Sequence, residues 1–383
     1  MLVSHWITTK HKIQPIGLDI GGRSVKMVQV AIDEDRVRVL AARKAPVDPT
    51  QAEEDSAREK NVVDAVRQLL ADGAFRGKSV VSALPIDKLR ITSLRLPEAE
   101  VPQADKLLRR EAVERFGLDP RNDIINYVLA GSVRQGDDVK NEYILFAADG
   151  ETIRSHIRIL ETVGLTPVGI DAPPCALFRV FERTMRRQED REKTVIFIDV
   201  GHRFTTVVFG RGGELCFVKQ IPIGIGRFNE EVASALGITV PDAELLRFKL
   251  QLDEPVDASM RRHVVDALNV TAEQLAAEVS LCLRYYTVTF RGKRVERTVV
   301  AGGGAYEQVL LDVLRRHLSV DVEVAEPLRG FELHQDRIDK DHESQSADLA
   351  LAVGLTLKGC RDLTSAEVNS SAAPETVLEG ESI

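Results

Sequence analysis

The feature of this sequence that most constrains its fold is a strand–turn–strand pattern that occurs twice, 180 positions apart. In each copy a continuous apolar run ends in Asp-x-Gly and an alternating strand follows, over 16–30 with Asp19 and over 195–209 with Asp199. Continuous apolar runs are typical of strands buried on both faces of a sheet. A repeat at this distance predicts a duplicated domain rather than a solenoid, whose units are roughly 20–50 residues long.

Composition excludes several classes of protein. The 383 residues suffice for two or three domains, and 44% hydrophobic with 29% charged residues is a globular rather than a disordered composition. The net charge of −8 argues against a dedicated nucleic-acid binder, which usually carries a basic stripe. No apolar run approaches the roughly 18 residues of a membrane span, and the start lacks the features of a signal peptide. Four distant cysteines without a CxxC pattern indicate reduced thiols, so we expect a soluble cytoplasmic protein.

The remaining elements follow in an order that predicts an insertion. A helix and a strand complete the first copy, and between residues 89 and 163 the pattern changes to strand, helix, two strands and helix. This change predicts a small α+β module inserted into the first half. The other segments are a charged linker (182–193), a polar loop (332–346), a last apolar helix (347–357) and a disordered tail (364–383).

The first hairpin has the residue types of a phosphate cradle. Gly21 and Gly22 let backbone N–H groups approach an anion closely, while Ser24 offers a hydroxyl and Lys26 a cation. Asp19, at the end of the strand, is placed to hold the water shell of Mg²⁺, which keeps several of its waters in proteins. Taken alone, the pattern also fits a structural hairpin whose aspartate caps the turn.

Two further elements favour the binding interpretation. The second copy repeats the aspartate and the glycine at Asp199 and Gly201 and adds two hydroxyls, Thr205 and Thr206. The third element is an apolar strand that leads into Gly302–Gly304 and then into a helix. Gly302 lies 103 positions after Asp199. Glycines before a helix N-terminus let the backbone approach an adenosine. The three elements together predict one nucleotide gripped from both sides.

The order of these elements resembles the actin-like ATPase superfamily, which also includes sugar kinases and heat-shock chaperones. Within it, residues from about 14 to 360 are most similar to the type IV pilus assembly protein PilM family, relatives of the cell-division protein FtsA. Three stretches carry the resemblance. The first runs from Leu94–Pro97 through Asp119-Pro120 to Asn126-Tyr127, and the second is Gly164–Asp171. The third combines Ile221–Phe228 with Asp242–Arg247.

The resemblance implies an α/β, actin-like two-lobed ATPase fold with an inserted small α+β subdomain (1C) in the first lobe. Subdomain 1C is implied to be where a partner binds. The implied divisions are the first lobe (1A, 14–85), subdomain 1C (86–167), a return to the first lobe (168–192), the second lobe (193–346), a closing helix (347–363) and a disordered tail (364–383).

The resemblance also assigns roles to individual residues. Lys26 would contact the phosphates of ATP, and Asp19 and Asp199 would hold Mg²⁺ through water. Glu244 and Arg247 would lie near the ribose or base, with Arg247 in place of the lysine that is usual in the family. No catalytic residue is assigned. The other implied binding residues are Gly21, Gly22, Ser24, Gly201, Thr205, Thr206, Gly224, Gly302, Gly303 and Gly304.

The tips of both hairpins depart from the family pattern. Gly22 and Arg23 stand where the family generally carries hydroxyl residues, and His202 and Arg203 where it usually has small ones. Because hydroxyls there help to set the γ-phosphate and metal geometry, slow or absent hydrolysis is implied. The two arginines either clamp phosphate oxygens or partly fill the site, and the sequence leaves both interpretations open.

By resemblance, the chain binds ATP and Mg²⁺ at the cytoplasmic face of the inner membrane, in a type IV pilus or type II secretion-like assembly platform. Its partner would be a PilN-like bitopic inner-membrane protein, whose cytoplasmic tail binds along subdomain 1C, beside other platform proteins. Nucleotide-dependent closure of the lobes would change how these partners are held. Two alternatives stay open: a sugar-kinase-type phosphotransferase and a nucleotide-free structural adaptor.

Several other motifs are excluded. Gly73–Ser79 looks like a P-loop, but three residues instead of four separate its glycines, and it follows a helix instead of a strand. The histidines form no HExxH pair, and no GxSxG elbow is present. The apolar helix face of Leu107, Leu108, Ala112 and Phe116 is expected to be core rather than a peptide groove.

Overall fold

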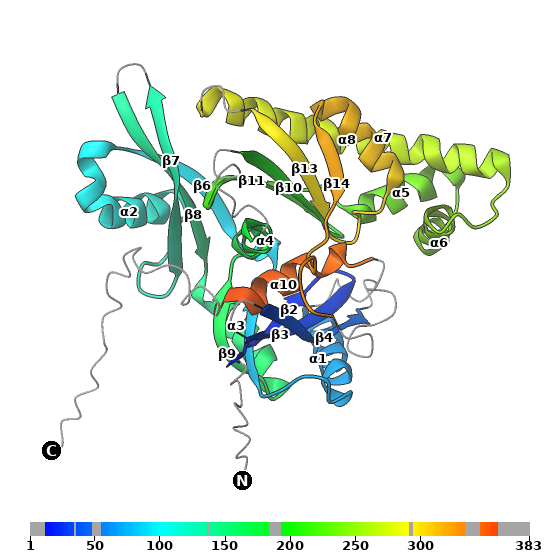
Figure 1. Cartoon of the computed structure of the whole chain (residues 1–383), viewed down its shortest axis with the longest axis horizontal. Coiled ribbons are helices and arrows are strands. Elements are labelled where there is room, and N and C mark those ends of the chain that lie inside the picture. The colour runs from blue at the N-terminus through cyan, green and yellow to red at the C-terminus, as the bar shows by residue number, and fades with distance from the viewer. Residues whose placement is uncertain are drawn as a thin grey trace, which may run out of the picture.

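The structure is a computed structural model that describes residues 12–33, 36–47, 55–135, 138–183, 193–290, 294–333 and 345–358. Its strands form three sheets of six, five and three strands. The two larger sheets lie in separate lobes, with helices α4 (Pro173–Glu182) and α10 (Ala350–Thr356) packed between them (Figure 1). The three-stranded sheet stands beside the second lobe.

The first sheet contains the first copy of the repeated pattern. Its strand order is β1-β3-β2-β5-β9, and β4 also pairs with β3. Strand β2 pairs antiparallel with β3 and parallel with β5, which places Asp19 opposite Lys26 in the register. The strands are β1 (Lys12–Ile13), β2 (Ile16–Ile20), β3 (Ser24–Asp33), β4 (Arg36–Pro46), β5 (Ser79–Ala83) and β9 (Thr166–Asp171).

The second sheet repeats this topology, as the duplicated pattern predicts. Its order is β12-β11-β10-β13-β14, in which β10 pairs antiparallel with β11 and parallel with β13. Asp199 occupies the position in β10 that Asp19 occupies in β2, at the strand end that leads into a hairpin. The strands are β10 (Thr194–Val200), β11 (Thr205–Arg211), β12 (Glu214–Ile221), β13 (Val295–Ala301) and β14 (Asp321–Val324).

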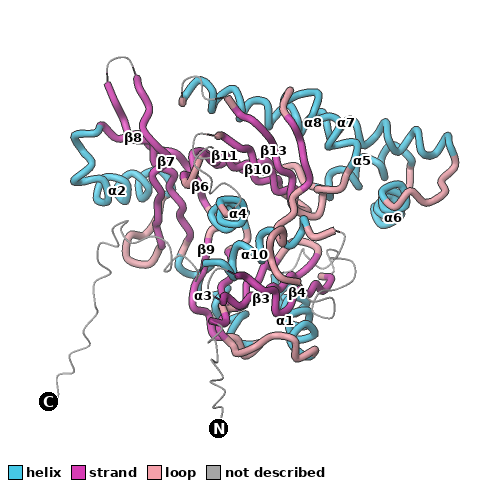
Figure 2. The backbone as a smooth tube through the Cα atoms, viewed as in Figure 1, coloured by secondary structure: helices cyan, strands magenta, loops and turns pink. Residues whose placement is uncertain are grey.

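Helices cover the outer faces of both sheets (Figure 2). Side chains cap several of them: the Asp257 carboxylate, for example, accepts hydrogen bonds from the backbone N–H groups of Ser259 and Met260 at the start of α7. None of the described helices is long and apolar enough to cross a membrane. The helices are α1 (Asp55–Ala71) and α3 (Gly150–Thr162) on the first sheet, and α5 (Ile225–Leu236), α6 (Val240–Gln251), α7 (Ala258–Thr289) and α8 (Gln308–Leu318) in the second lobe.

The three-stranded sheet forms a small unit with its own core. It has the order β6-β8-β7, and α2 packs on it, so that Leu108 and Ala112 are fully buried as expected. Leu107 and Phe116 of the same predicted core face are only partly buried, and Leu107 lines a groove instead. The elements are β6 (Arg90–Pro97), α2 (Ala104–Phe116), β7 (Ile124–Gln135) and β8 (Asp138–Ala148).

The inserted segment predicted over 86–167 extends further along the chain than this unit. Helix α3 and strand β9 pack in the layers of the first sheet, where Leu160 and Leu165 join the core around β2. Their apolar spacing is compatible with either location, so the sequence pattern alone did not separate them. Most of the charged linker, the polar loop with His334 and His342, and the tail from Thr364 lie outside the described residues.

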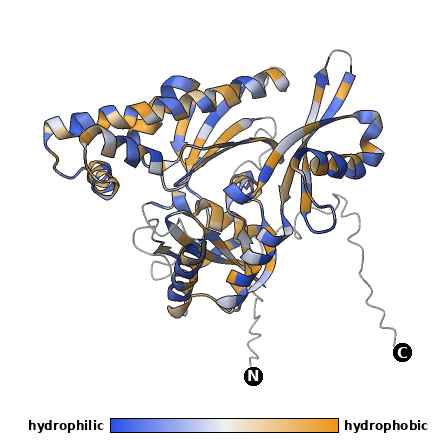
Figure 3. Ribbon diagram, turned by 180° about the vertical axis from the view of Figure 1, so that it is seen from behind, coloured by the Kyte–Doolittle hydropathy of each residue, from blue (hydrophilic) through white to orange (hydrophobic). Residues whose placement is uncertain are grey.

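The largest apolar cluster joins all three sheets. It includes Val28 of β3, Ile144 of β8 and Phe197 of β10, with the stacked rings of Phe181 and Phe197 at a centroid distance of 4.8 Å. Figure 3 shows largely hydrophobic strands between helices that carry both kinds of residue. Apolar side chains of the first lobe therefore continue into the core of the second, while a separate cluster around β2 fills the rest of the first lobe.

Candidate functional site

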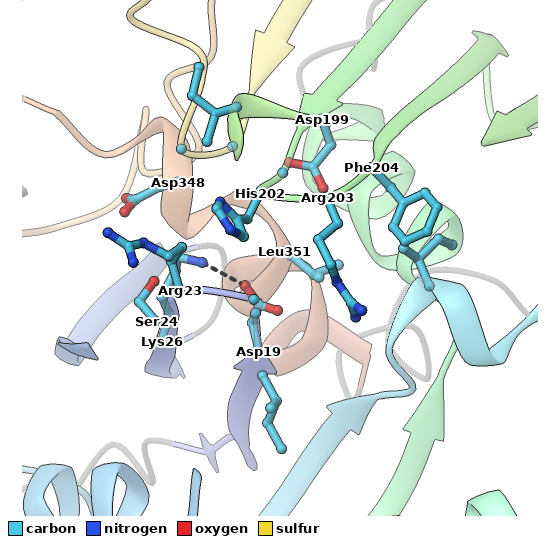
Figure 4. A pocket seen from close by; sticks show the side chains of 18 of the residues that line it. Asp19, Arg23, Ser24, Lys26, Asp199, His202, Arg203, Phe204, Asp348 and Leu351 are labelled. Carbon is cyan, nitrogen blue, oxygen red and sulfur yellow. Dashed lines mark hydrogen bonds and ion pairs between the residues drawn. The ribbon is translucent and has the colours of Figure 1, made fainter. Parts of the chain in front are cut away.

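The two Asp-x-Gly hairpins face each other across a cavity between the lobes (Figure 4). The cavity has a volume of about 610 Å³ and is lined from the first lobe by Asp19 and Lys26 and from the second by Asp199. The hairpin tips are close, since a Cβ added to Gly22 would lie 3.2 Å from the Cβ of His202. Two segments that are far apart in the chain thus form one site.

Lys26 lies among acidic groups from both lobes in the cavity. Lys26 Nζ donates to Asp19 Oδ2 at 3.0 Å, and both side chains are almost fully buried. Burial alone would lower the pKa of Lys26, but the negative charges of Asp19, Asp348 and Asp199 outweigh it and raise this pKa above its ordinary value. The lysine is therefore charged and compensates carboxylates from both lobes.

Asp199 has the opposite electrostatic environment. Burial first, and the neighbouring carboxylate of Asp19 second, raise its pKa to about 6 from the ordinary 3.8. Lys26 offsets part of this shift. A divalent cation at this place would favour the ionised carboxylate and lower its pKa.

The glycine turn closes the cavity behind Asp199. Gly302 has a φ of +86°, and a Cβ there would lie 2.4 Å from Asp199 Oδ1, so only glycine fits this approach. A Cβ on Gly303 would meet nothing within 4 Å, and Gly303 lines the cavity. The backbone of the turn is thus directly accessible from the cavity.

Arg247 lines the cavity, but its guanidinium is engaged within the second lobe. The side chain is 3% exposed; its Nε donates to Asn229 Oδ1 at 2.9 Å, and its Nη1 pairs with Glu307 Oε2 at 3.3 Å. These contacts join α6 to α5 and to the start of α8. Arg247 therefore positions the helix that carries Glu244, which is a role that its sequence position did not reveal.

Two ion pairs between residues that line the cavity cross the cleft, and a third, between Arg36 and Glu332, joins the lobes away from the cavity. Arg23 of the first hairpin pairs with Glu244 of α6 in the second lobe. Arg203 of the second hairpin pairs with Asp87 of the first lobe at 2.8 Å. Both arginines therefore bind carboxylates of the opposite lobe, an arrangement that neither sequence interpretation of these residues included.

The structure places twelve of the predicted binding residues on the cavity wall and three behind it. Thr205 is fully buried, and its hydroxyl donates to the carbonyl oxygen of Ile223 at 2.6 Å. Gly224 and Gly304 pack tightly against the backbone of His202 and the side chain of Val200. The residues on the wall are Asp19, Gly21, Gly22, Ser24, Lys26, Asp199, Gly201, Thr206, Glu244, Arg247, Gly302 and Gly303.

An acidic residue that the sequence patterns did not indicate lies at the edge of this site. Asp348 lies in the turn Ala347–Leu349 before α10, lines the cavity and pairs with Lys44 of β4 at 2.6 Å. Its signal in the sequence was one carboxylate inside the otherwise apolar run of the last helix. In the described part of the chain no three acidic, histidine or cysteine side chains are close enough to hold a metal directly. Asp19, Asp199 and Asp348 all line the cavity, and carboxylate oxygens are the kind of acceptor that the waters of a hydrated Mg²⁺ bind.

Comparison with known families and structures adds to this geometry. The family model of the type IV pilus assembly protein PilM matches residues 17–360. The chain belongs to this family. The PilM–PilN type IV pilus biogenesis complex is a similar solved structure, with a TM-score of 0.74 and 22% sequence identity, over 90% of this chain and 98% of that chain.

A second similar structure is the ethanolamine utilization protein EutJ from Carboxydothermus hydrogenoformans. Its TM-score is 0.52 and its sequence identity 16%, over 90% of this chain and 89% of that chain. Sequence identities this low show a shared fold. Together with the family match they confirm the expected two-lobed α/β, actin-like fold of the PilM family.

A second cavity lies on the three-stranded unit, far from the hairpins in sequence. It measures about 600 Å³ and opens between β6, α2 and the end of α7, where Arg95 Nη2 donates to the Tyr285 hydroxyl at 3.3 Å. The groove carries apolar, basic and acidic side chains, including Leu94, Leu107, Arg110, Arg115, Glu100 and Glu111.

Proposed function

We propose that this PilM-family chain binds ATP with Mg²⁺ in the cleft and acts as a cytoplasmic component of a type IV pilus or type II secretion-like assembly platform. The observation that carries the proposal is the convergence of three elements on one cavity. The two Asp-x-Gly hairpins and the glycine turn at Gly302 and Gly303 come from distant parts of the chain, yet all line the same 610 Å³ space. Lys26 supplies a buried cation to this space.

The residues of the cavity are of the types that bind the phosphates of a nucleotide together with Mg²⁺. Lys26 would bind phosphate oxygens, and the backbone at Gly21, Gly22 and Gly201 would approach them closely. Asp19 and Asp199 would hold the waters of Mg²⁺, and the bound ion would neutralise phosphate charge. Glu244 and the glycine turn would face the nucleoside.

Hydrolysis of the nucleotide is expected to be slow or absent. The hairpin tips carry Gly22, Arg23, His202 and Arg203, where the family resemblance implies hydroxyl and small residues. Both arginines are bound to carboxylates of the opposite lobe. The cleft is therefore better suited to binding and closure than to activation of a water molecule.

The proposed partner is a PilN-like bitopic inner-membrane protein, held by its cytoplasmic tail. The PilM–PilN complex supports this choice, because it contains a relative with the same fold together with PilN. We place the tail along the three-stranded unit, where the groove between β6 and α2 offers apolar and charged side chains. Such a partner would keep the chain at the cytoplasmic face of the inner membrane.

Titration calorimetry of ATP with Mg²⁺ tests the nucleotide site. We expect the wild type to bind with micromolar affinity, about −8 kcal/mol, and Asp19→Ala and Lys26→Ala to lose the binding heat. Lys249→Ala is a matched control, because Lys249 lies in α6 but is not among the residues that line the cavity. Circular dichroism of each variant checks that it is folded.

The opposite result would favour a nucleotide-free adaptor. The ion pairs of Arg23 and Arg203 across the cleft are the observation that supports this second candidate. A folded wild type that gives neither binding heat nor a rise in melting temperature with ATP would establish it.

Fluorescence anisotropy with a labelled tail peptide of the PilN-like partner tests the groove. Reversing the charges of Arg110 and Arg115, which line it, is expected to weaken binding at least severalfold. Arg121→Glu is the control, since Arg121 is an exposed residue of the same unit that does not line the groove. Unchanged binding by the Arg110→Glu, Arg115→Glu variant would place the tail elsewhere.

A further inference from the structure

The tips of the two hairpins carry arginines for which the proposed nucleotide site has no required role. Arg23 lies in the turn between β2 and β3, and Arg203 in the turn between β10 and β11. In Figure 4 the two side chains lie on either side of His202. Both arginines line the cavity between the lobes.

Each guanidinium binds a carboxylate of the other lobe. Arg23 reaches from the first lobe to Glu244 in the second, and Arg203 reaches from the second lobe to Asp87 in the first, in the turn Ile86–Lys88. The paired residues are 221 and 116 positions apart in the chain. Neither ion pair can form unless the two lobes are together.

The partial burial of the two ion pairs allows them to influence the equilibrium between open and closed arrangements of the lobes. The carboxylate side chains are 18% and 20% exposed, and the arginines are 35% and 47% exposed. Partly buried pairs are less screened than fully exposed ones, yet each remains accessible enough to break. Two such pairs that form and break with one motion add their effects.

We propose that these two ion pairs are a latch that holds the two lobes together across the cleft. Between them, Gly22 lets the hairpin tips touch, since its added Cβ would already lie 3.2 Å from His202 Cβ. The absence of a side chain at Gly22 permits the closed approach, and the arginines on either side hold it. The latch concerns the contact between the lobes and does not rest on nucleotide binding.

The test is the distance distribution between two spin labels, measured without ligand by pulsed electron paramagnetic resonance. Exposed positions for the labels are Lys60 in α1 and Leu252 at the end of α6, one in each lobe. Encoding the labels as unnatural amino acids leaves the native cysteines unchanged. The main variant combines Arg23→Glu with Arg203→Glu, which turns both attractions into repulsions.

We expect this variant to raise the ratio of open to closed molecules roughly tenfold. Combining Arg23→Glu with Glu244→Arg restores one pair in reverse and is expected to be more closed than Arg23→Glu alone. Arg227→Glu is the control, because Arg227 pairs with Glu230 and Glu231 inside α5 and crosses no cleft.

Two results would overturn the latch: an unchanged distribution in the folded double-reversal variant, or a charge-swapped variant no more closed than Arg23→Glu. If the double reversal does not fold, Arg23→Gln with Arg203→Gln keeps the polarity and is expected to open the cleft in the same direction. Because no ATP is added, failure of the latch and failure of the nucleotide site are separate results.

Discussion

At the scale of single residues, Asp199 makes the stability of the folded protein depend on pH. Burial and the charge of Asp19 raise its pKa to about 6 in the folded protein. Since the folded state binds this proton more tightly than the unfolded chain, the contribution of Asp199 to the free energy of unfolding falls as pH rises from about 4 to about 6. We expect Asp199→Asn to be more stable than the wild type above about pH 6 and similar to it near pH 4.

Urea denaturation at about pH 4 and about pH 7.5 measures this difference. Asp64→Asn, a change at an exposed position of α1, is the control and is expected to leave the pH dependence unaltered. Equal stability differences at both pH values would show that Asp199 is not the titrating group.

Arg247 is a second residue whose substitution is expected to lower the free energy of unfolding. It forms an ion pair with Glu307, and both side chains are at most 7% exposed. Arg247→Met leaves the Glu307 carboxylate buried without its cation, so we expect the free energy of unfolding to fall by about 3 kcal/mol. Adding Glu307→Gln is expected to recover part of this loss. In denaturant unfolding, Arg227→Met at an exposed pair of α5 should change stability by less than about 0.5 kcal/mol.

At the scale of elements, the contact of α10 with β2 depends on a missing side chain. A Cβ on Gly17 would lie 2.1 Å from the carbonyl oxygen of Ala352 and 2.6 Å from the backbone nitrogen of Thr356. We expect Gly17→Ala to lower the free energy of unfolding by about 2–3 kcal/mol, because the helix must move off the strand. Gly303→Ala, where an added Cβ meets no atom within 4 Å, should be nearly neutral in the same denaturation experiment. Equal effects of the two substitutions would contradict the close packing.

At the scale of the whole molecule, the apolar cluster that joins all three sheets couples the lobes. Phe197 is fully buried in the cluster that contains side chains from all three sheets. We expect Phe197→Ala to cost about 3–5 kcal/mol and to lower one common melting temperature, because the lobes unfold together. Differential scanning calorimetry checks this. Two separated transitions, of which only one responds to the substitution, would show that the lobes unfold independently.

Much of the architecture follows from signals within short stretches of the sequence. The apolar runs that end at Asp19 and Asp199 predicted two buried strands with hairpins, and both antiparallel hairpins are present. Gly302 and Gly303 likewise follow an apolar strand directly. Such features depend on backbone sterics and on the burial of neighbouring side chains, so a local pattern is sufficient to predict them.

The tertiary structure decided what depends on distant partners. Arg23 and Arg203 looked like phosphate ligands or fillers of the site, and only the docking of the lobes brought Glu244 and Asp87 to them. Asp348 reaches the cleft because α10 packs between the sheets. The sequence by itself determined the duplicated fold and the residue types around the cleft. The charge pairing across the cleft was decided by the packing of the lobes against each other, because ion pairs between distant residues form only where packing places both partners.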